Sequence, residues 1–214
     1  GWDIPVATAS ITMNGGDIEW GIFGGGVKES ATVTDSVNVV INDGKLNDGV
    51  LGGGILGNVG TAEKPAVINV TIGKEGEENA DKPVVAQNIM GGGFYGDVYG
   101  DTEVTINNCH SDFNGSGSAT FNCASGVAGT QYGNSKIVVN GGYINGQVAG
   151  GTMYGGVLNG NSQVIINGGT VLQRVSGGSC YGGGDVNGNT EVIVNGGTIG
   201  DDIEKGNSYY GIFG

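Results

Sequence analysis

The stretch Ile137-Val138-Val139-Asn140-Gly141-Gly142 is an aliphatic run that ends in Asn-Gly-Gly, and it decides the fold because it recurs. It returns as V-I-I-N-G-G at residues 164–169 and as V-I-V-N-G-G at residues 192–197, which gives spacings of 27 and 28 residues. A period of this length is the sequence signature of a solenoid, in which each repeat stacks on its neighbours. Weaker copies begin at Ile11, Val39, Val70 and Val104, so the period covers nearly the whole chain.

Each repeat contains short strand-like pieces that are joined by glycine-rich bends. Gly and β-branched residues dominate them, and no helical apolar periodicity is present, which excludes helix over most of the chain. We expect an all-β fold: a single-stranded, right-handed parallel β-helix of about seven coils of 27–28 residues, with insertions in the third and fourth coils. Residues 1–214 are expected to form one β-solenoid domain, a fragment of a longer secreted or surface protein.

Alternate aliphatic side chains in the first strand of each repeat are expected to point inward and stack as the core. The Asn that follows most of these strands is expected to form a ladder of side-chain amides at one corner. Between the inward positions a β-branched residue faces the other way, as strand propensity favours, and at Val138, Ile165 and Ile193 it forms an apolar stripe. Such a stripe suits a covering element, a flat binding surface or lateral self-association. The predicted inward pairs are Ile11/Met13, Val39/Ile41, Val70/Ile72, Val104/Ile106, Ile137/Val139, Val164/Ile166 and Val192/Val194.

The charge of the chain limits its partners. It has 21 acidic and 8 basic residues, so its net charge is -13. A charge of this sign disfavours nucleic acid and anionic membrane surfaces. A run of about 18 apolar residues, which direct membrane insertion needs, is missing. Neutral or weakly charged partners therefore fit better.

Two repeats depart from the consensus by insertion. The third repeat adds a charged segment at residues 74–82, and the fourth adds a polar one at residues 108–117. Insertions in a solenoid leave the stack at a corner, so we expect these two side by side as a binding site. The alternative is surface decoration without a partner. The candidate residues are Glu75, Glu77, Glu78, Asp81, His110, Asp112 and Phe113.

A tyrosine follows the second glycine-rich bend in several repeats. Tyr95, Tyr154 and Tyr181 occupy this position, and Tyr132 is close to the same register. One tyrosine per coil predicts an exposed platform on which sugar rings or protein side chains stack. Internal aromatic stacking is the alternative.

The cysteines suggest a disulfide more than a metal site. Cys109 and Cys123 flank a polar stretch. A disulfide that closes a loop of about 15 residues stabilises the folded state by roughly 3 kcal/mol, because it restricts the unfolded chain. Cys180 is expected to stay free and buried. Cys109, His110, Asp112 and Cys123 lack the C-x-x-C spacing of zinc sites, and a disulfide would consume the thiolates. Residues 96–102 and 184–190 match calcium-binding nonapeptide repeats poorly, so we expect no cofactor, with calcium as the weak alternative.

Catalysis is the third functional class to weigh, because parallel β-helices include pectin-degrading lyases and hydrolases. That resemblance implies a calcium-binding carboxylate cluster and a basic residue for the lyases, and several Asp residues for the hydrolases. This chain has one Arg, one His, and one adjacent Asp pair, Asp201-Asp202. We therefore expect no enzyme activity, and a polysaccharide lyase or hydrolase is the least favoured hypothesis.

The recurrent pattern V-x-I-N-G-G-T-[IV], followed by G-G-x-x-Y-G and V-x-G-N-[ST], is typified by Val186-Asn187-Gly188-Asn189-Thr190. It resembles the Gly/Asn-rich β-helical repeats of bacterial surface adhesins and autotransporter-like passenger domains. The resemblance implies an extracellular or bacterial cell-surface location and supplies no catalytic residues. Our leading hypothesis is an adhesin-like binding module for a host macromolecule such as mucin glycan, immunoglobulin or matrix protein. The alternative is a passive structural stalk.

Overall fold

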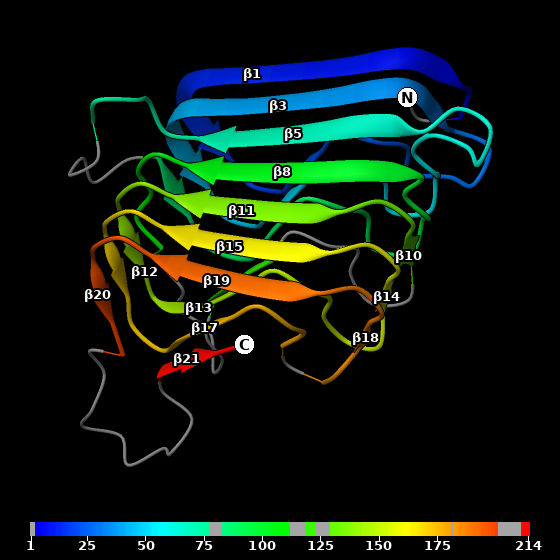
Figure 1. Cartoon of the computed structure of the whole chain (residues 1–214). Helices are drawn as coiled ribbons and strands as arrows, with labels where there is room; N and C mark the ends of the chain where they lie inside the picture. The colour runs from blue at the N-terminus through cyan, green and yellow to red at the C-terminus, as the bar shows by residue number, and fades with distance from the viewer. Residues whose placement is uncertain (1–2, 78–82, 112–118, 123–128, 181, 201–210) are drawn as a thin grey trace.

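The computed structural model describes residues 3–77, 83–111, 119–122, 129–180, 182–200 and 211–214. All regular structure in these residues is β-strand, and the paired strands run parallel in four stacked sheets (Figure 1). Neighbouring strands within a sheet come from successive sequence repeats. The predicted all-β, solenoid-like class is therefore confirmed. The described residues include no helix with the length and apolarity needed to cross a membrane.

The largest sheet collects the long strand of each repeat, stacked from β1 at the top of Figure 1 to β19 below. The strands keep the predicted register, since Ile137 pairs with Val104 on one side and with Val164 on the other. A short strand, β6 (Val84–Val85), pairs with the far end of β3. The sheet order is β1 (Val6–Ile18), β3 (Val33–Leu46), β5 (Ala66–Ile72), β8 (Gly100–Ile106), β11 (Ser135–Val139), β15 (Ser162–Ile166) and β19 (Thr190–Val194).

Three further sheets contain the shorter strands of the repeats. One three-stranded sheet contains β10 (Thr130–Gln131), β14 (Val157–Leu158) and β18 (Asp185–Val186), and another contains β12 (Tyr143–Ile144), β16 (Thr170–Val171) and β20 (Thr198–Ile199). The last sheet contains β2 (Ile22–Phe23), β4 (Val50–Leu51), β7 (Ile89–Met90), β9 (Ala119–Asn122), β13 (Gly146–Ala149), β17 (Arg174–Ser176) and β21 (Gly211–Phe213).

The inward aliphatic positions form the core as predicted. Between the two edge strands, all the predicted pairs from Val39/Ile41 to Val164/Ile166 are buried. At the edges the side chains are less covered, because β1 and β19 each have a neighbour on one side only. Ile11 and Val192 are half-buried, and Val194 is exposed. Val138, Ile165 and Ile193 are half-buried on the outer face of the sheet, and self-association through them stays a prediction.

The glycine-rich turn that follows β2 needs glycine for steric reasons. A Cβ at Gly24 would lie 2.3 Å from the carbonyl oxygen of Gly52 and 2.5 Å from Cγ1 of Val37 on β3. Distances this short are not tolerated, so any larger residue would push the turn away from the core. The glycines thus let one wall of the stack approach the largest sheet closely.

The predicted asparagine ladder is present. Nδ2 of each Asn donates to Oδ1 of the Asn in the preceding repeat, at 2.7 Å for Asn42 to Asn14 and at 2.8 Å for Asn195 to Asn167. Asn140 and Asn167 make the same bonds, at 2.9 and 2.8 Å. The ladder is interrupted at Gly73, where Nδ2 of Asn107 donates to the backbone carbonyl instead, at 3.2 Å.

Candidate functional site

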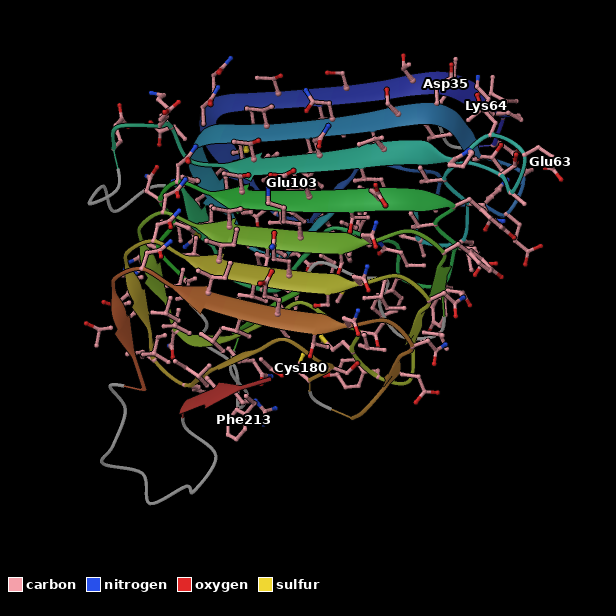
Figure 2. The ribbon with its side chains drawn as sticks, in the orientation of Figure 1. Asp35, Glu63, Lys64, Glu103, Cys180 and Phe213 are labelled. Carbon is pink, nitrogen blue, oxygen red and sulfur yellow. The ribbon has the colours of Figure 1, made fainter. Side chains whose placement is uncertain are left out.

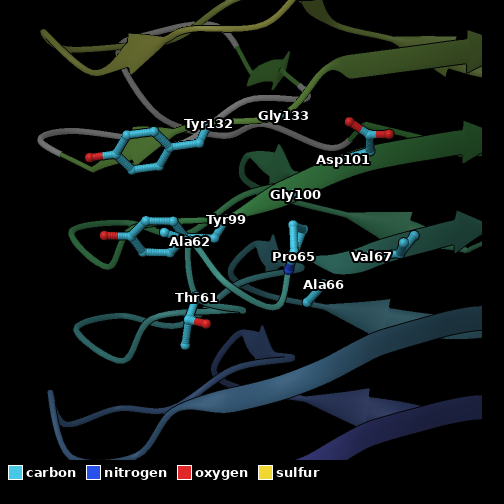
Figure 3. A pocket seen from close by; sticks show the side chains of 10 residues that line it. All are labelled: Thr61, Ala62, Pro65, Ala66, Val67, Tyr99, Gly100, Asp101, Tyr132 and Gly133. Atoms are coloured by element: carbon cyan, nitrogen blue, oxygen red, sulfur yellow. The ribbon is translucent and has the colours of Figure 1, made fainter.

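A groove lies where the segment after β4 meets the starts of β5, β8 and β11 (Figure 3). It is open to solvent and has a cavity volume of about 650 Å³. Its lining combines two tyrosines, a proline, small residues and one carboxylate. The lining residues are Thr61, Ala62, Pro65, Ala66, Val67, Tyr99, Gly100, Asp101, Tyr132 and Gly133.

Two stacked tyrosines form one wall of this groove. Val98 pairs with Gln131 of the following repeat, and this pairing places Tyr132 directly over Tyr99. The ring centroids are 4.5 Å apart and the ring planes differ by 7° (Figure 3). The Tyr132 side chain is 49% exposed. The pair therefore presents a preformed aromatic surface to solvent.

The backbone next to Tyr132 is fixed by a buried glutamine, Gln131. Nε2 of Gln131 donates to the Asn134 carbonyl oxygen at 2.7 Å and to Oγ1 of Thr102 at 3.0 Å. Gly100, which lines the groove, is required there, because it has a φ of +146° and an added Cβ would lie 1.7 Å from the Ala66 carbonyl oxygen. Buried hydrogen bonds and close backbone packing thus fix the chain around the groove.

A polar trough continues from the groove across the outer face of the largest sheet. Its cavity volume is about 380 Å³, and it shares Val67 and Asp101 with the tyrosine groove. Lys136 and Glu103 form an ion pair of 3.0 Å within it. The remaining lining residues are Asn69, Thr102, Asn134, Ser135, Asn161 and Gln163. The four amide side chains among them are exposed or half-buried, whereas the Thr102 and Ser135 hydroxyls are buried.

The surroundings of the groove are acidic. Burial raises the pKa of the Tyr99 hydroxyl above its usual value, and Tyr132, Asp97 and Glu63 raise it further. Lys64 lies between the lining residues Ala62 and Pro65 in the sequence, and it is paired with Asp35 (Figure 2). Lys136, which lines the adjoining trough, is paired with Glu103.

The predicted tyrosine column is interrupted. Tyr132 does not continue the column of Tyr95 but stacks on Tyr99, because the additional residues of the fourth repeat shift its register. Tyr95 is exposed and meets Phe94 edge-to-face, with centroids 4.8 Å apart. It lies on a separate apolar cleft of about 380 Å³. Tyr154 is exposed with a φ of +52°, and Tyr181 lies outside the described residues.

The two insertions meet the stack at adjacent points. The backbone N–H of His110 donates to the Pro83 carbonyl oxygen at 2.9 Å, which joins the end of one insertion to the start of the other. The His110 ring stacks on Tyr143, with centroids 5.2 Å apart. Glu75 and Glu77 are exposed. Glu78, Asp81, Asp112 and Phe113 lie outside the described residues, so a shared site on the insertions stays a prediction.

Cys109 and Cys180 are buried, and burial raises the pKa of each thiol to about 12. Cys123 lies outside the described residues, so its disulfide with Cys109 stays a prediction. Among the described residues, no group of three or more His, Cys, Asp or Glu side chains is placed to hold a metal ion. Asp201 and Asp202 also lie outside the described residues.

The contact between Tyr99 and Tyr132 was not predicted from the sequence. The signal was available, because Tyr99-Gly100-Asp101-Thr102 and Tyr132-Gly133-Asn134-Ser135 share the pattern Y-G-[DN]-[TS]. Alignment on this pattern gives the observed pairing of Thr102 with Ser135.

Comparisons with protein-family models, with curated proteins and with solved structures found no significant match for this chain. The functional assignment therefore depends on the residues of the groove itself.

Proposed function

We propose that this protein is an extracellular, adhesin-like binding module, and that the groove beside Tyr99 and Tyr132 is its ligand site. The ligand we propose is a glycan. The observation that carries the proposal is the parallel tyrosine pair, with Tyr132 exposed and Tyr99 half-buried, next to a trough of amides and carboxylates. Binding sites commonly combine an apolar aromatic surface with a few fixed polar groups, and sugars present both apolar C–H faces and hydroxyl groups.

The shape of the groove suits a chain-like ligand. The aromatic groove and the polar trough share Val67 and Asp101, so they form one continuous depression across successive repeats. An extended oligosaccharide could place one ring beside the tyrosines and the next over Asn134 and Lys136. The groove is also supported by strands on both sides, so little ordering is needed on binding, which favours affinity.

We further propose that the parallel sheets form one right-handed β-helix of about seven coils over residues 1–214. Parallel strands joined by a crossover are right-handed in nearly all known cases. The repeated register of the largest sheet supports one uninterrupted stack. In this arrangement the groove lies at a corner of the rod, accessible from the side.

A passive stalk is the second candidate function. The regular asparagine ladder favours it, because such a ladder stabilises a long stack without any ligand. The two functions differ in their prediction: a stalk shows no saturable binding to any glycan.

The experiment is a glycan array followed by titration of the best glycan against the purified chain. We expect Tyr132→Ala to weaken binding about tenfold or more, which corresponds to roughly 1.4 kcal/mol. Tyr132→Phe keeps the ring and should retain most of the affinity. Tyr143→Ala is the matched control, since Tyr143 is another exposed, stacked tyrosine but lies outside the groove. Equal losses in Tyr132→Ala and Tyr143→Ala would contradict this site, and the absence of saturable binding would favour the stalk.

A further inference from the structure

Asp101 has an unusual place in a second ladder at the start of the long strands. Oδ1 of Asp101 accepts hydrogen bonds from the backbone N–H of Asn134 at 2.7 Å and from its Nδ2 at 3.2 Å. In the next repeats the same backbone bond is made to asparagine: Asn161 N–H to Asn134 Oδ1, and Asn189 N–H to Asn161 Oδ1, both at 2.9 Å. The ladder therefore needs one oxygen per position, which an asparagine supplies equally well.

The second carboxylate oxygen of Asp101 is not used by the ladder. Within the described residues, the hydrogen bonds to this carboxylate are both made to Oδ1. On the other side, the residue in register is Val67, which offers no polar group and is 47% exposed. The ladder thus ends at Asp101, an exposed residue that lines the groove.

The position of Asp101 joins the two halves of the depression. It lines both the tyrosine groove and the polar trough, so a ligand that spans them must pass its carboxylate. Two lysines nearby are paired with other carboxylates, Lys136 with Glu103 and Lys64 with Asp35. A ligand that runs from the tyrosines into the trough therefore meets the Asp101 carboxylate at the end of the groove away from the rings (Figure 3).

This combination favours a ligand with a positive charge. A cation is attracted by the face of a tyrosine ring and by a carboxylate, and charge-assisted hydrogen bonds are about twice as strong as neutral ones. An anionic sugar would be repelled by the same groups and by the net charge of -13.

Resting on the proposed function, we infer that the groove selects an amino-bearing saccharide, and that Asp101 is the specificity-determining residue, which accepts a hydrogen bond from the ligand ammonium through Oδ2. Asp101 has no role in fold formation that asparagine would not fill, which makes the inference testable by a conservative variant.

The test compares three oligosaccharides of equal length: oligomers of glucosamine, of N-acetylglucosamine and of galacturonic acid. Titrations are run at low salt and mildly acidic pH, where the glucosamine amines are protonated and the carboxylates are ionised. We expect the glucosamine oligomer to bind about tenfold more tightly than the N-acetylated one, and the galacturonic acid oligomer not to bind. Asp101→Asn should abolish this preference, so that the glucosamine and N-acetylglucosamine oligomers bind with similar affinity.

Asp17→Asn is the matched control, because Asp17 is an exposed aspartate on β1, outside the groove, and its loss changes the net charge equally. The control should keep the full preference, and thermal unfolding should show that both variants are folded. Equal binding of the amino and N-acetylated oligomers, or a preference that survives Asp101→Asn, would overturn the inference and leave the proposed function standing. Failure of all three oligomers and of every neutral glycan to bind would overturn the proposed function itself.

Discussion

The hydroxyl of Ser162 donates a hydrogen bond of 2.5 Å to the carbonyl oxygen of Gly177. Ser162 lies on β15 in the largest sheet and Gly177 directly follows β17 on the opposite wall, and both residues are buried. Ser135 makes the same bond to Gly150 in the preceding repeat. The interior of the stack thus contains polar links between its walls, in register with one another.

We expect Ser162→Ala to lower the free energy of unfolding by about 1–3 kcal/mol, because the substitution leaves the buried Gly177 carbonyl without its donor. Urea unfolding followed by circular dichroism measures the change. Ser10→Ala is the control, since Ser10 is exposed on β1, and it should change stability by less than about 0.5 kcal/mol. Equal effects at the two serines would contradict the role of the cross-wall bond.

The glycine turn gives a second prediction. A Cβ at Gly52 would lie 2.2 Å from the Gly91 carbonyl oxygen and 2.6 Å from Cγ2 of Ile68. We expect Gly52→Ala to destabilise the fold by about 2–3 kcal/mol, because the turn must move away from the core. At Gly178 the nearest atom is 3.9 Å from an added Cβ, so Gly178→Ala should be nearly neutral in the same unfolding assay.

The asparagine ladder predicts a smaller loss of stability. Asn167 donates to Asn140 and accepts from Asn195, so Asn167→Ala removes two hydrogen bonds and leaves one partner on each side. Because the ladder is exposed, we expect a loss of about 1–2 kcal/mol. Asn69→Ala, at an exposed position outside the ladder, serves as the control. A neutral Asn167→Ala would show that water replaces the ladder bonds at no cost.

The buried thiols give a prediction for reactivity and pH. Burial raises the pKa of Cys109 and Cys180 to about 12, so both should resist alkylation at pH 8 in the folded protein and react in urea that contains a reductant, as mass spectrometry will show. Since the unfolded thiols lose their protons near pH 9, stability should fall as the pH rises from about 9 to 12. Rapid alkylation of the native chain would contradict this.

The same labelling tests the predicted disulfide between Cys109 and Cys123. If it forms, only Cys180 reacts when the chain is unfolded without a reductant. Labelling at all three cysteines would show that the disulfide is absent.

The sequence predicted the parallel stack and the core well, because both depend on a short-range pattern. Alternation places Val164 and Ile166 inward, and the constant period brings each strand beside its equivalent. The tyrosine groove was not predicted, because its register depends on how the fourth repeat accommodates its additional residues. Tyr99 and Tyr132 are brought together by the pairing of Val98 with Gln131. This pairing cannot be found by counting residues from the glycine turn of each repeat.

The polar groups of the site were equally hard to predict, for a different reason. Asp101 belongs to a regular ladder, and in the sequence it differs from Asn134 and Asn161 by a single atom type. The ladder ends at Asp101 because its neighbour in the preceding repeat is Val67, which has no polar side-chain group. A one-dimensional pattern shows the repeated residues but not which member of a column stands at its end.

The interruption of the asparagine ladder at Gly73 divides it into two separate series of hydrogen-bonded side-chain amides. Aligned amides polarise one another, so Asn107, Asn140, Asn167 and Asn195 act as one head-to-tail series of dipoles, whereas Asn14 and Asn42 form an isolated pair. The longer series has a direction, with its amide hydrogens facing the first repeats and its oxygens facing the last. Substitutions within it should therefore be non-additive, while those in the short pair should affect only each other.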